Sequence, residues 1–402
     1  MDINSLLSSF QRSDYQRDNF DAFLKKVRFS FSLPAIHIAG TNGKGSTASY
    51  LAAIYQQNGY KVGRFTSPYL FEVNEMIVVN GTPISDDDFL NIFNEYEKLF
   101  RKYDLSAFEI ETLIAFNYFM KEACDICVIE CGMGGEIDAT NIFVPILSII
   151  TSISLEHTDF LGHTISEIAE QKCGIIKDKI PLLIDEFDQD AVATIYKEAK
   201  NKQTPIHFIK KHIETSFDKK GISFQYHPFG LVHLNSFAPY ACQDACFALE
   251  ATLLLRDQFP IKVEETVNAL GNVFMECRFE IIDNVILDGG HNTEAAKEVV
   301  SAINQYTNKP IHVIFACFKD KNLGSLLSYY GSLGDDLTLT TFHHPRARTQ
   351  DEYFLFLGDY QFVENPIQLL KDKMEEYPDD IILITGSIAF VAYMKKEALK
   401  NV

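Results

Sequence analysis

The stretch that decides the fold is Ala35-Ile36-His37-Ile38-Ala39-Gly40-Thr41-Asn42-Gly43-Lys44-Gly45-Ser46-Thr47. Its first residues are mostly apolar or β-branched, as in a short buried strand, and a helical pattern over 48–58 follows the glycine-rich turn. Backbone N–H groups in such a turn converge on an anion, and the N-terminus of the helix adds a positive dipole. The stretch therefore predicts a phosphate-binding loop between a strand and a helix.

Side chains within this loop have predicted roles in holding a nucleotide. Lys44 would reach the β- and γ-phosphates, and in the usual pattern a hydroxyl just after the lysine would hold Mg²⁺. The spacing departs from the usual pattern, because two residues rather than four separate Gly40 from Gly43. Gly45 also falls between Lys44 and Ser46. The alternative is a tight turn with a solvated lysine, but the strand before and the helix after favour the phosphate loop.

The composition is that of an ordinary globular protein. The 402 residues are 47% hydrophobic, 23% charged and 12% aromatic, without Trp, which allows a large core divided over two or three domains. The net charge of −19 argues against nucleic acid or an anionic membrane as a partner, since both are polyanions.

The sequence predicts no targeting segment. Residues 1–20 are polar and lack the apolar core of a signal peptide, and the longest apolar runs are strand-sized, so we expect a cytoplasmic protein. The eight cysteines are then expected as buried thiols rather than disulfides. We do not expect zinc at Cys124, Cys127 and Cys131. On a strand, Cys124 and Cys127 would point to opposite faces, and no second pair of ligands follows.

Polar side chains follow three further predicted strands in the first half of the chain. These strands cover 61–66, 126–130 and 146–151, and they lead into Thr66-Ser67-Pro68, Glu130 and Glu156-His157-Thr158-Asp159. Because the carboxyl ends of parallel strands meet at one edge of a sheet, Glu130 is well placed to act on Mg²⁺ beside the phosphate loop. The alternatives are a surface carboxylate at a turn for Glu130 and an ordinary surface or core side chain for His157.

Helical patterns surround these strands. Ser85 caps one helix, and a second, over 107–121, carries Phe108, Glu109, Glu111 and Thr112. Other predicted elements are short helices in 1–30, a hairpin over 76–81, helices over 166–176, 190–200, 240–257 and 263–270, strands over 180–184 and 206–209, and antiparallel strands over 213–237. Lys172 lies on the helix over 166–176, where a lysine is usually solvated.

The pattern resets near residue 275. A strand over 281–287 ends at Asp288-Gly289-Gly290-His291-Asn292, and an alternation of strands and helices then continues to the last helix. The sequence thus predicts an α/β fold with a P-loop-type, mostly parallel sheet ATPase domain over 1–275. A smaller Rossmann-like α/β domain covers 276–402. Two such domains, one of them holding ATP, indicate an ATP-dependent transferase or ligase.

Five motifs resemble those of the folylpolyglutamate synthase/dihydrofolate synthase family, a part of the Mur ligase superfamily. They follow the family's order over nearly the whole chain, and they are Gly40-Thr41-Asn42-Gly43-Lys44-Gly45-Ser46, Thr66-Ser67-Pro68, Val128-Ile129-Glu130-Cys131-Gly132-Met133-Gly134-Gly135, Leu161-Gly162-His163-Thr164 and Asp288-Gly289-Gly290-His291-Asn292. The resemblance implies an ATP-dependent ligase that adds L-glutamate to a folate, to dihydropteroate or to both, through an acyl phosphate. It also implies two Mg²⁺ ions, small-molecule substrates and a monomer.

The resemblance assigns roles to single residues. ATP would lie on Asn42, Gly43, Lys44, Gly45 and Ser46, with Asp244, Arg278 and Asp288 as further contacts; Ser67 and Glu130 would bind one Mg²⁺, and Glu130 and His157 a second. Lys44, His157, Lys172 and His291 are the catalytic candidates, and Thr112 and Asp138 are the candidates for substrate binding. Lys172 matches a lysine that the family carries as a carbamate, which would turn a cation into an anion near the second metal.

Some positions depart from the family's pattern. Met76 stands where the family usually has Arg, Glu136 where it often has Arg, Asp244 in place of an adenine-side Asn, Glu276-Cys277 in place of Pro-Gly and Gly290 in place of Ala. None of these changes removes a phosphate or metal group. They bear on substrate preference and adenine contacts more than on catalysis.

Two other functions are the alternatives. A Mur-type ligase would join an amino acid to a UDP-sugar peptide, but such enzymes usually carry a further N-terminal domain, and a phosphate loop near residue 40 leaves no room for one. A non-catalytic ATP-binding regulator would not need the intact set of Lys44, Ser67, Glu130, His157 and Lys172.

Overall fold

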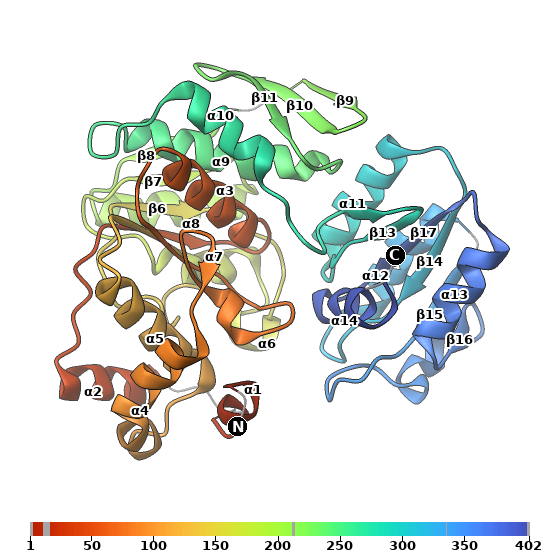
Figure 1. The fold of residues 1–402 in the computed structure, drawn as a ribbon, viewed down its shortest axis with the longest axis horizontal. Helices are drawn as coiled ribbons and strands as arrows, with labels where there is room; N and C mark the ends of the chain where they lie inside the picture. Colours follow the sequence, from red (N-terminus) through yellow and green to blue (C-terminus); the bar gives the residue numbers. More distant parts are fainter. Residues whose placement is uncertain (1–2, 11–16, 211–213, 335, 400–402) are drawn as a thin grey trace. The chain divides into compact units, whose positions relative to one another are not determined.

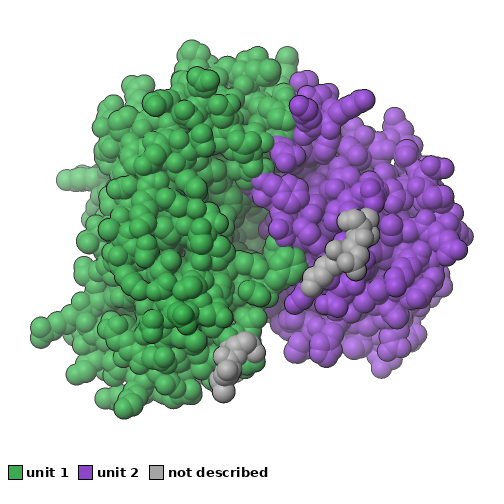
Figure 2. Space-filling model, in the orientation of Figure 1, with its two compact units in different colours: residues 1–215, 223–234, 241–273 green, residues 216–222, 235–240, 274–402 purple. Residues whose placement is uncertain are grey.

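The computed structural model describes residues 3–10, 17–210, 214–334 and 336–399. The chain divides into two compact units, coloured separately in Figure 2. Unit 1 comprises residues 1–215, 223–234 and 241–273, and unit 2 comprises residues 216–222, 235–240 and 274–402. Each unit contains its own mostly parallel sheet, so the predicted α/β class is confirmed.

The sheet of unit 1 has eight strands in the order β4-β3-β2-β5-β1-β6-β7-β8. Their bounds are β1 (Ala35–Ala39), β2 (Val62–Phe65), β3 (Ile77–Val79), β4 (Thr82–Pro83), β5 (Ile126–Glu130), β6 (Leu147–Ile150), β7 (Leu182–Ile184) and β8 (Ile206–Phe208). All neighbouring pairs are parallel except β2–β3 and β3–β4. β3 and β4 form the predicted hairpin, with Asn80-Gly81 as its turn. The fully buried β1 and β5 are the apolar runs identified in the sequence.

The register of this sheet brings the predicted site segments to one edge. Ile38 of β1 pairs with Glu130 of β5, and Ala39 pairs with Ile150 of β6. The phosphate loop, Glu130 and the segment after Ile150 therefore leave the sheet side by side, as the prediction required.

Helices cover both faces of this sheet (Figure 1). They are α1 (Ile3–Ser8), α2 (Arg17–Val27), α3 (Lys44–Gln57), α4 (Asp86–Lys102), α5 (Ala107–Lys121), α6 (Thr158–Leu161), α7 (Ile165–Cys173), α8 (Gln189–Asn201), α9 (Pro239–Leu254) and α10 (Val263–Asn272), with the 3₁₀ turn η1 (Val73–Met76). α2, α4 and α5 pack on one side in a phenylalanine-rich core, where the rings of Phe23 and Phe100 lie 5.6 Å apart. α3 contacts β1, β2 and β5 and packs against α10.

Unit 2 has a six-stranded sheet in the order β12-β13-β17-β14-β15-β16. Its elements are β12 (Glu280–Ile282), β13 (Val285–Leu287), α11 (Thr293–Tyr306), β14 (Ile311–Phe315), α12 (Leu323–Tyr330), η2 (Gly331–Leu333), β15 (Leu337–Thr340), η3 (Gln350–Phe356), β16 (Gln361–Val363), α13 (Pro366–Glu376), β17 (Ile381–Thr385) and α14 (Ile388–Ala398). Every pair in this sheet is parallel except β12–β13.

Two predictions for unit 2 need correction. The single strand predicted over 281–287 is two antiparallel strands, because the chain turns at Asp283, whose φ of 52° is left-handed. The short edge strand β16 was not predicted, since its residues are only partly buried and give no apolar run. The other strands of the unit alternate with helices up to the last helix, α14, as the sequence predicts, whereas the 3₁₀ turns η2 and η3 were not predicted.

A separate sheet has the order β11-β10-β9, with bounds β9 (Thr215–Asp218), β10 (Gly221–Tyr226) and β11 (Gly230–Leu234). It lies within the segment 213–237 in which the sequence predicts strands; residue 213 is outside the described part.

The cysteines follow the prediction in one respect and not in another. All eight are free and buried, as expected. Cys124, however, lies before β5 rather than on it, and its thiol interacts with that of Cys127, so the predicted opposite orientation of these two side chains is wrong. Among the described residues, no helix has both the length and the apolar character needed to cross a membrane.

Candidate active site

The phosphate loop joins β1 to α3 through backbone that only glycine adopts readily. α3 begins at Lys44, earlier than the predicted residue 48, so Gly45 and Ser46 lie in its first turn. Gly43 precedes the helix with a left-handed φ of 82°, and a Cβ there would lie 2.3 Å from Asp244 Oδ1. Without a capping side chain at Gly43, the first N–H groups of α3 point into the loop, where an anion would bind.

Side chains and the end of β6 fix the shape of the loop. Lys44 Nζ folds back and donates to the carbonyls of Gly40, at 2.9 Å, and Thr41, at 3.1 Å. The Asn42 N–H donates to Ser152 Oγ at 2.7 Å, and the Asn42 carbonyl accepts from Thr151 Oγ1 at 2.6 Å. Thr151 and Ser152, which follow the neighbouring strand β6, therefore hold the loop in place.

Glu130 lies beside this loop at the end of β5. Its side chain is buried, and its Oε2 accepts a hydrogen bond of 3.0 Å from the backbone N–H of Ser67, at the end of β2. A Cβ at Gly45 would approach the same oxygen to 3.2 Å. Three segments that are distant in sequence thus meet around one carboxylate: the loop helix, the Ser67 turn and β5.

Lys172 differs from the solvated side chain that its local pattern predicts. It is fully buried on α7, and its ammonium forms an ion pair of 2.7 Å with Glu156 Oε1. Burial lowers the pKa of Lys172, against the opposing effect of Glu156. Burial alone would raise the pKa of Glu156, but the charges of Lys172 and Lys44 outweigh it and lower that pKa to about 2. His157, the next residue, caps α6 with a left-handed φ of 45°.

A buried polar network holds the segment around Asp138. The Asp138 carboxylate accepts from the N–H of Met133, at 2.8 Å, and from the N–H of Thr140, at 2.9 Å. Thr140 Oγ1 also bonds to this carboxylate, and it lies 2.8 Å from Nε2 of His37 in β1. Burial lowers the pKa of His37 to about 3, so the ring is neutral. Burial raises the pKa of Asp138.

Arg17 is a contributor that the sequence reasoning missed. Its guanidinium, at the start of α2, donates to the backbone carbonyls of Ile137, Asp138 and Asn141. The contact joins residues about 120 positions apart, and no local pattern in 17–27 indicates it.

Two further predicted residues of unit 1 are buried. Thr112 is completely buried on α5, and its hydroxyl donates to the Phe108 carbonyl at 2.8 Å within the same helix. Its substrate role stays a prediction. Asp244 is buried on α9 next to Gly43, and its backbone carbonyl accepts from Thr47 Oγ1 at 3.4 Å.

The predicted residues of unit 2 gather at the end of β13. Asp288 is buried and accepts hydrogen bonds from the Tyr240 hydroxyl, from the N–H of Phe279 at 2.9 Å and from the N–H of Gly290 at 2.8 Å. Burial raises the pKa of Asp288, while Tyr240 and the positive charge of Arg278 act to lower it. His291 Nδ1 lies 3.1 Å from the Gly289 carbonyl. The fixed carboxylate of Asp288 therefore has the charge of Arg278 acting on it, and His291 follows it three residues later in the chain.

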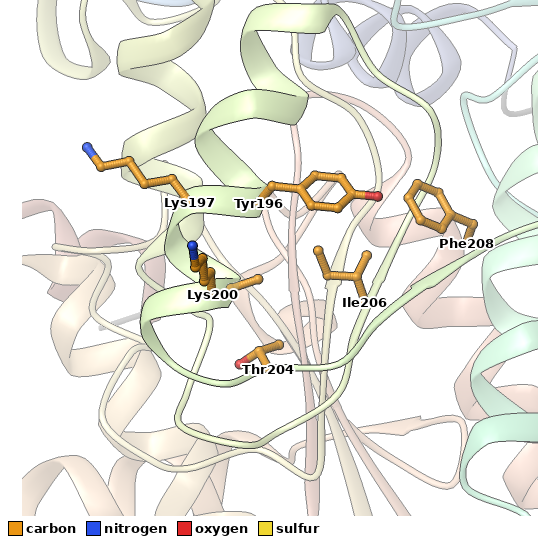
Figure 3. Close-up of a pocket in the computed structure, with 7 residues that line it drawn as sticks. Tyr196, Lys197, Lys200, Thr204, Ile206 and Phe208 are labelled. Atoms are coloured by element: carbon orange, nitrogen blue, oxygen red, sulfur yellow. The ribbon is translucent and has the colours of Figure 1, made fainter.

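A surface groove of about 740 Å³ lies between α8 and the edge strand β8 (Figure 3). It is lined by Tyr196, Lys197, Ala199, Lys200, Thr204, Ile206 and Phe208. Tyr196 points toward Ile206 and Phe208, and Lys197 points away. None of the predicted site residues lines this groove, so we assign it no part in the candidate site.

Two protein families match consecutive parts of the chain. Residues 38–242 match the Mur ligase middle domain, and residues 277–388 match the glutamate ligase domain of Mur ligases. With a phosphate loop on a parallel sheet and a second α/β unit, these matches define the class of the protein, which is a member of the Mur ligase superfamily.

Similarity to individual proteins identifies the family within this class. The dihydrofolate synthase/folylpolyglutamate synthase of Bacillus subtilis is 30% identical over 396 residues, which cover 92% of this chain and 90% of that protein. The chain therefore belongs to the folylpolyglutamate synthase/dihydrofolate synthase family of ATP-dependent ligases, as its motifs predicted.

Solved structures agree with this fold. The Mycobacterium tuberculosis folylpolyglutamate synthase complexed with ADP and AMPPCP has a TM-score of 0.88 at 24% identity, covering 98% of this chain and 97% of that chain. Escherichia coli FolC in complex with ADP has a TM-score of 0.86 at 25% identity, covering 98% and 96%.

Proposed function

We propose that this protein uses ATP to join L-glutamate to the carboxylate of a pteroyl substrate, either dihydropteroate or a folate that already bears glutamate. The single observation that carries this proposal is the meeting of the phosphate loop, Ser67 and Glu130 at one sheet edge. The names of the relatives cover both acceptors, and structures of similar proteins contain ADP or AMPPCP. We also propose that the enzyme is a cytoplasmic monomer.

The proposed reaction has two steps. An oxygen of the substrate carboxylate attacks the γ-phosphorus of ATP, the bond to the β,γ-bridging oxygen breaks, and ADP leaves with that electron pair. The deprotonated amine of L-glutamate then attacks the acyl carbon, and the bond from this carbon to the phosphate oxygen breaks. Inorganic phosphate leaves, and the nitrogen loses a second proton as the amide forms.

The residues of the loop would bind and orient the triphosphate. The N–H groups at the start of α3 and the ammonium of Lys44 supply positive charge where the phosphates carry negative charge. In unit 2, we propose Arg278 and Asp288 as nucleotide contacts and His291 as a catalytic residue, in line with their convergence after β13. Asp244, next to Gly43, is the proposed adenine-side contact, and Asn42 and Ser46 complete the nucleotide site.

Mg²⁺ fits the donors at this edge. This ion usually binds one or two carboxylates together with substrate phosphates rather than a cage made by protein alone. Accordingly, the described part of the chain contains no group of three or more His, Cys, Asp or Glu side chains that could hold a metal without help. We propose Ser67 and Glu130 as ligands of one ion and Glu130 and His157 as ligands of a second. When bound, these ions would offset the charge on the γ-phosphoryl group.

We propose that Lys172 carries a carbamate in the active enzyme. Its amine nitrogen would bond to the carbon of carbon dioxide and lose a proton, which requires the neutral amine. Burial lowers the pKa of Lys172 and so favours that form. After incubation with ¹³C-bicarbonate, a carbamate resonance should appear in the wild type and be absent from Lys172→Ala. Identical spectra would leave Lys172 as the cation of a structural ion pair.

One acceptor comparison tests the function as a whole. Glutamate-dependent ADP release and amide product are measured with dihydropteroate, tetrahydrofolate and a UDP-muramoyl acceptor. We expect product with one or both pteroyl acceptors and none with the UDP-sugar. Lys44→Ala is the matched control, because it should fold normally and lose ATP turnover. Absence of ligation with every pteroyl acceptor would overturn the proposal.

A further inference from the structure

One tyrosine hydroxyl connects the loop after β13 to the last residue of the neighbouring strand β17. Tyr330, the last residue of α12, is completely buried, and its hydroxyl donates to the Gly290 carbonyl at 2.9 Å. The same oxygen accepts a hydrogen bond of 3.0 Å from Thr385 Oγ1, at the end of β17. β13 and β17 are parallel neighbours, so Thr385 and Gly290 leave the same edge of the sheet.

This connection depends on the absence of a side chain at residue 290. A Cβ at Gly290 would lie 2.5 Å from the Tyr330 hydroxyl oxygen, a distance that real Cβ contacts essentially never show. The other nearby atoms, Val299 Cγ2 at 3.1 Å and Asp288 Oδ1 at 3.3 Å, require only small shifts. The tyrosine hydroxyl and the glycine are therefore matched to each other. The hydroxyl can lie this close to the backbone only because residue 290 has no Cβ.

The segment held in this way carries the candidate chemistry of unit 2. Gly290 stands between Asp288 and His291, and its own N–H donates to Asp288 at 2.8 Å. His291 Nδ1 approaches the carbonyl of Gly289. The buried hydrogen bond from Tyr330 fixes the Gly290 carbonyl. A shift of that peptide would move the carboxylate partner and the histidine together.

We propose that Tyr330 is a positioning residue for the Asp288–Asn292 segment and that Gly290 is required because this hydroxyl must reach the backbone. The proposal rests on the proposed function, since it concerns the placement of Asp288 and His291 for ligation. Tyr330 itself does not touch substrate. Tyr330 acts by fixing the position of the segment. Because the Thr385 hydroxyl donates to the Tyr330 oxygen, the proton of the Tyr330 hydroxyl is directed toward the Gly290 carbonyl.

Three variants and a matched control test this proposal. Tyr330→Phe removes only the hydroxyl, Gly290→Ala adds only the methyl group, and the double variant removes the oxygen that the methyl group would meet. Tyr329→Phe removes the neighbouring hydroxyl on the same helix as the control. For each protein, kcat and KM for ATP and L-glutamate are measured along with Tm, and hydrogen–deuterium exchange is followed for the peptide that contains 288–292.

We expect Gly290→Ala to lower kcat/KM by at least about tenfold and Tyr330→Phe by about fivefold, the scale of one lost hydrogen bond. In the Tyr330→Phe background, the added methyl group should cost less than about twofold, because the clash is gone. Exchange in 288–292 should accelerate in both single variants, with Tm close to that of the wild type. Tyr329→Phe should behave as the wild type.

Two results would overturn the proposal. The first is a cost of Gly290→Ala that is the same with and without the hydroxyl. The second is a loss of activity that follows Tm, with unchanged exchange in 288–292. The exchange measurement needs no turnover, so it separates the two hypotheses. If the wild type does not ligate glutamate but Tyr330→Phe still accelerates exchange in this segment, the proposed function is wrong, while the positioning of the segment by Tyr330 is supported.

Discussion

The buried ion pair of Lys172 and Glu156 couples stability to the candidate site. In the absence of bicarbonate, where Lys172 is the ammonium partner of Glu156, we expect Lys172→Met to destabilise the protein by about 3–5 kcal/mol, because the Glu156 carboxylate would be left buried without its cation. In the double variant with Glu156→Gln, most of the stability should return, since no buried charge is left. Ligase activity should stay low in both variants. Urea unfolding and initial rates measure the two effects, and a single variant as stable as the wild type would contradict this account.

Glu111 on α5 predicts a pH dependence of stability. Burial raises its pKa from the ordinary 4.5 to about 8. Between these values the unfolded chain has released the proton and the folded chain has kept it. The free energy of unfolding should therefore fall as the pH rises from 4.5 to 8, by up to about 1.4 kcal/mol per pH unit.

Glu111→Gln isolates this contribution. The variant should match the wild type in stability near pH 4.5 and exceed it at pH 8, as measured by urea unfolding across the range. Glu95→Gln, at an exposed position on α4, is the control and should leave the pH dependence unchanged. A wild-type curve parallel to that of Glu111→Gln would mean that Glu111 ionises freely in the folded protein.

Single side chains of the site were predictable to different degrees. Glu130 ends a strand, and Lys44 begins the helix after the loop that follows another strand; the sequence marks both strands, so the convergence of these residues followed from the parallel topology. Arg17 and Glu156 were missed as partners, because the contacts they make depend on the tertiary fold. Burial of Lys172 is likewise a tertiary effect that a helical pattern does not reveal.

α2 contributes to the candidate site through its first residue. Arg17→Ala should raise KM for the pteroyl acceptor by about tenfold and leave KM for ATP unchanged, because the guanidinium holds three carbonyls of the segment around Asp138. Arg17→Lys should not restore the wild-type value, since an ammonium lacks the planar fork of donors. Lys25→Ala, exposed on the same helix, is the control. Equal changes in both KM values would place the effect of Arg17 elsewhere.

Whole elements were predicted well where one periodicity dominated. The buried strands β1 and β5 and the helix α5 lie close to their predicted bounds, and Ser85 caps α4 as predicted. The strand over 281–287 was wrong because its turn needs only Asp283-Asn284, two residues inside an apolar run. Cys124 was misplaced because α5 ends at Lys121 and the chain then passes through a left-handed residue, Ala123, so that β5 begins only at Ile126. Such turns are set by backbone geometry more than by composition.

For the whole chain, the sequence indicated two α/β parts in the correct order. It did not indicate the order of strands within either sheet, such as β5 lying between β2 and β1. Strand order depends on crossovers between segments far apart in the chain, and one local pattern is compatible with several of them. The motifs reduced the number of possible strand orders, because the strand before the phosphate loop and the strand that ends in Glu130 must lead to the same edge of the sheet.

Ligand binding should stabilise the whole protein in a manner that identifies the phosphate site. A ligand that binds only the folded chain adds RT ln(1 + [L]/Kd) to the free energy of unfolding, about 2.7 kcal/mol at a hundredfold excess over Kd. ATP with Mg²⁺ should therefore raise Tm, EDTA should reduce this increase, and Lys44→Ala should abolish most of it. Lys197→Ala, in the groove between α8 and β8, should keep the full increase. If Lys197→Ala lost the increase and Lys44→Ala kept it, the nucleotide would bind in that groove, and the loop after β1 would be a structural turn.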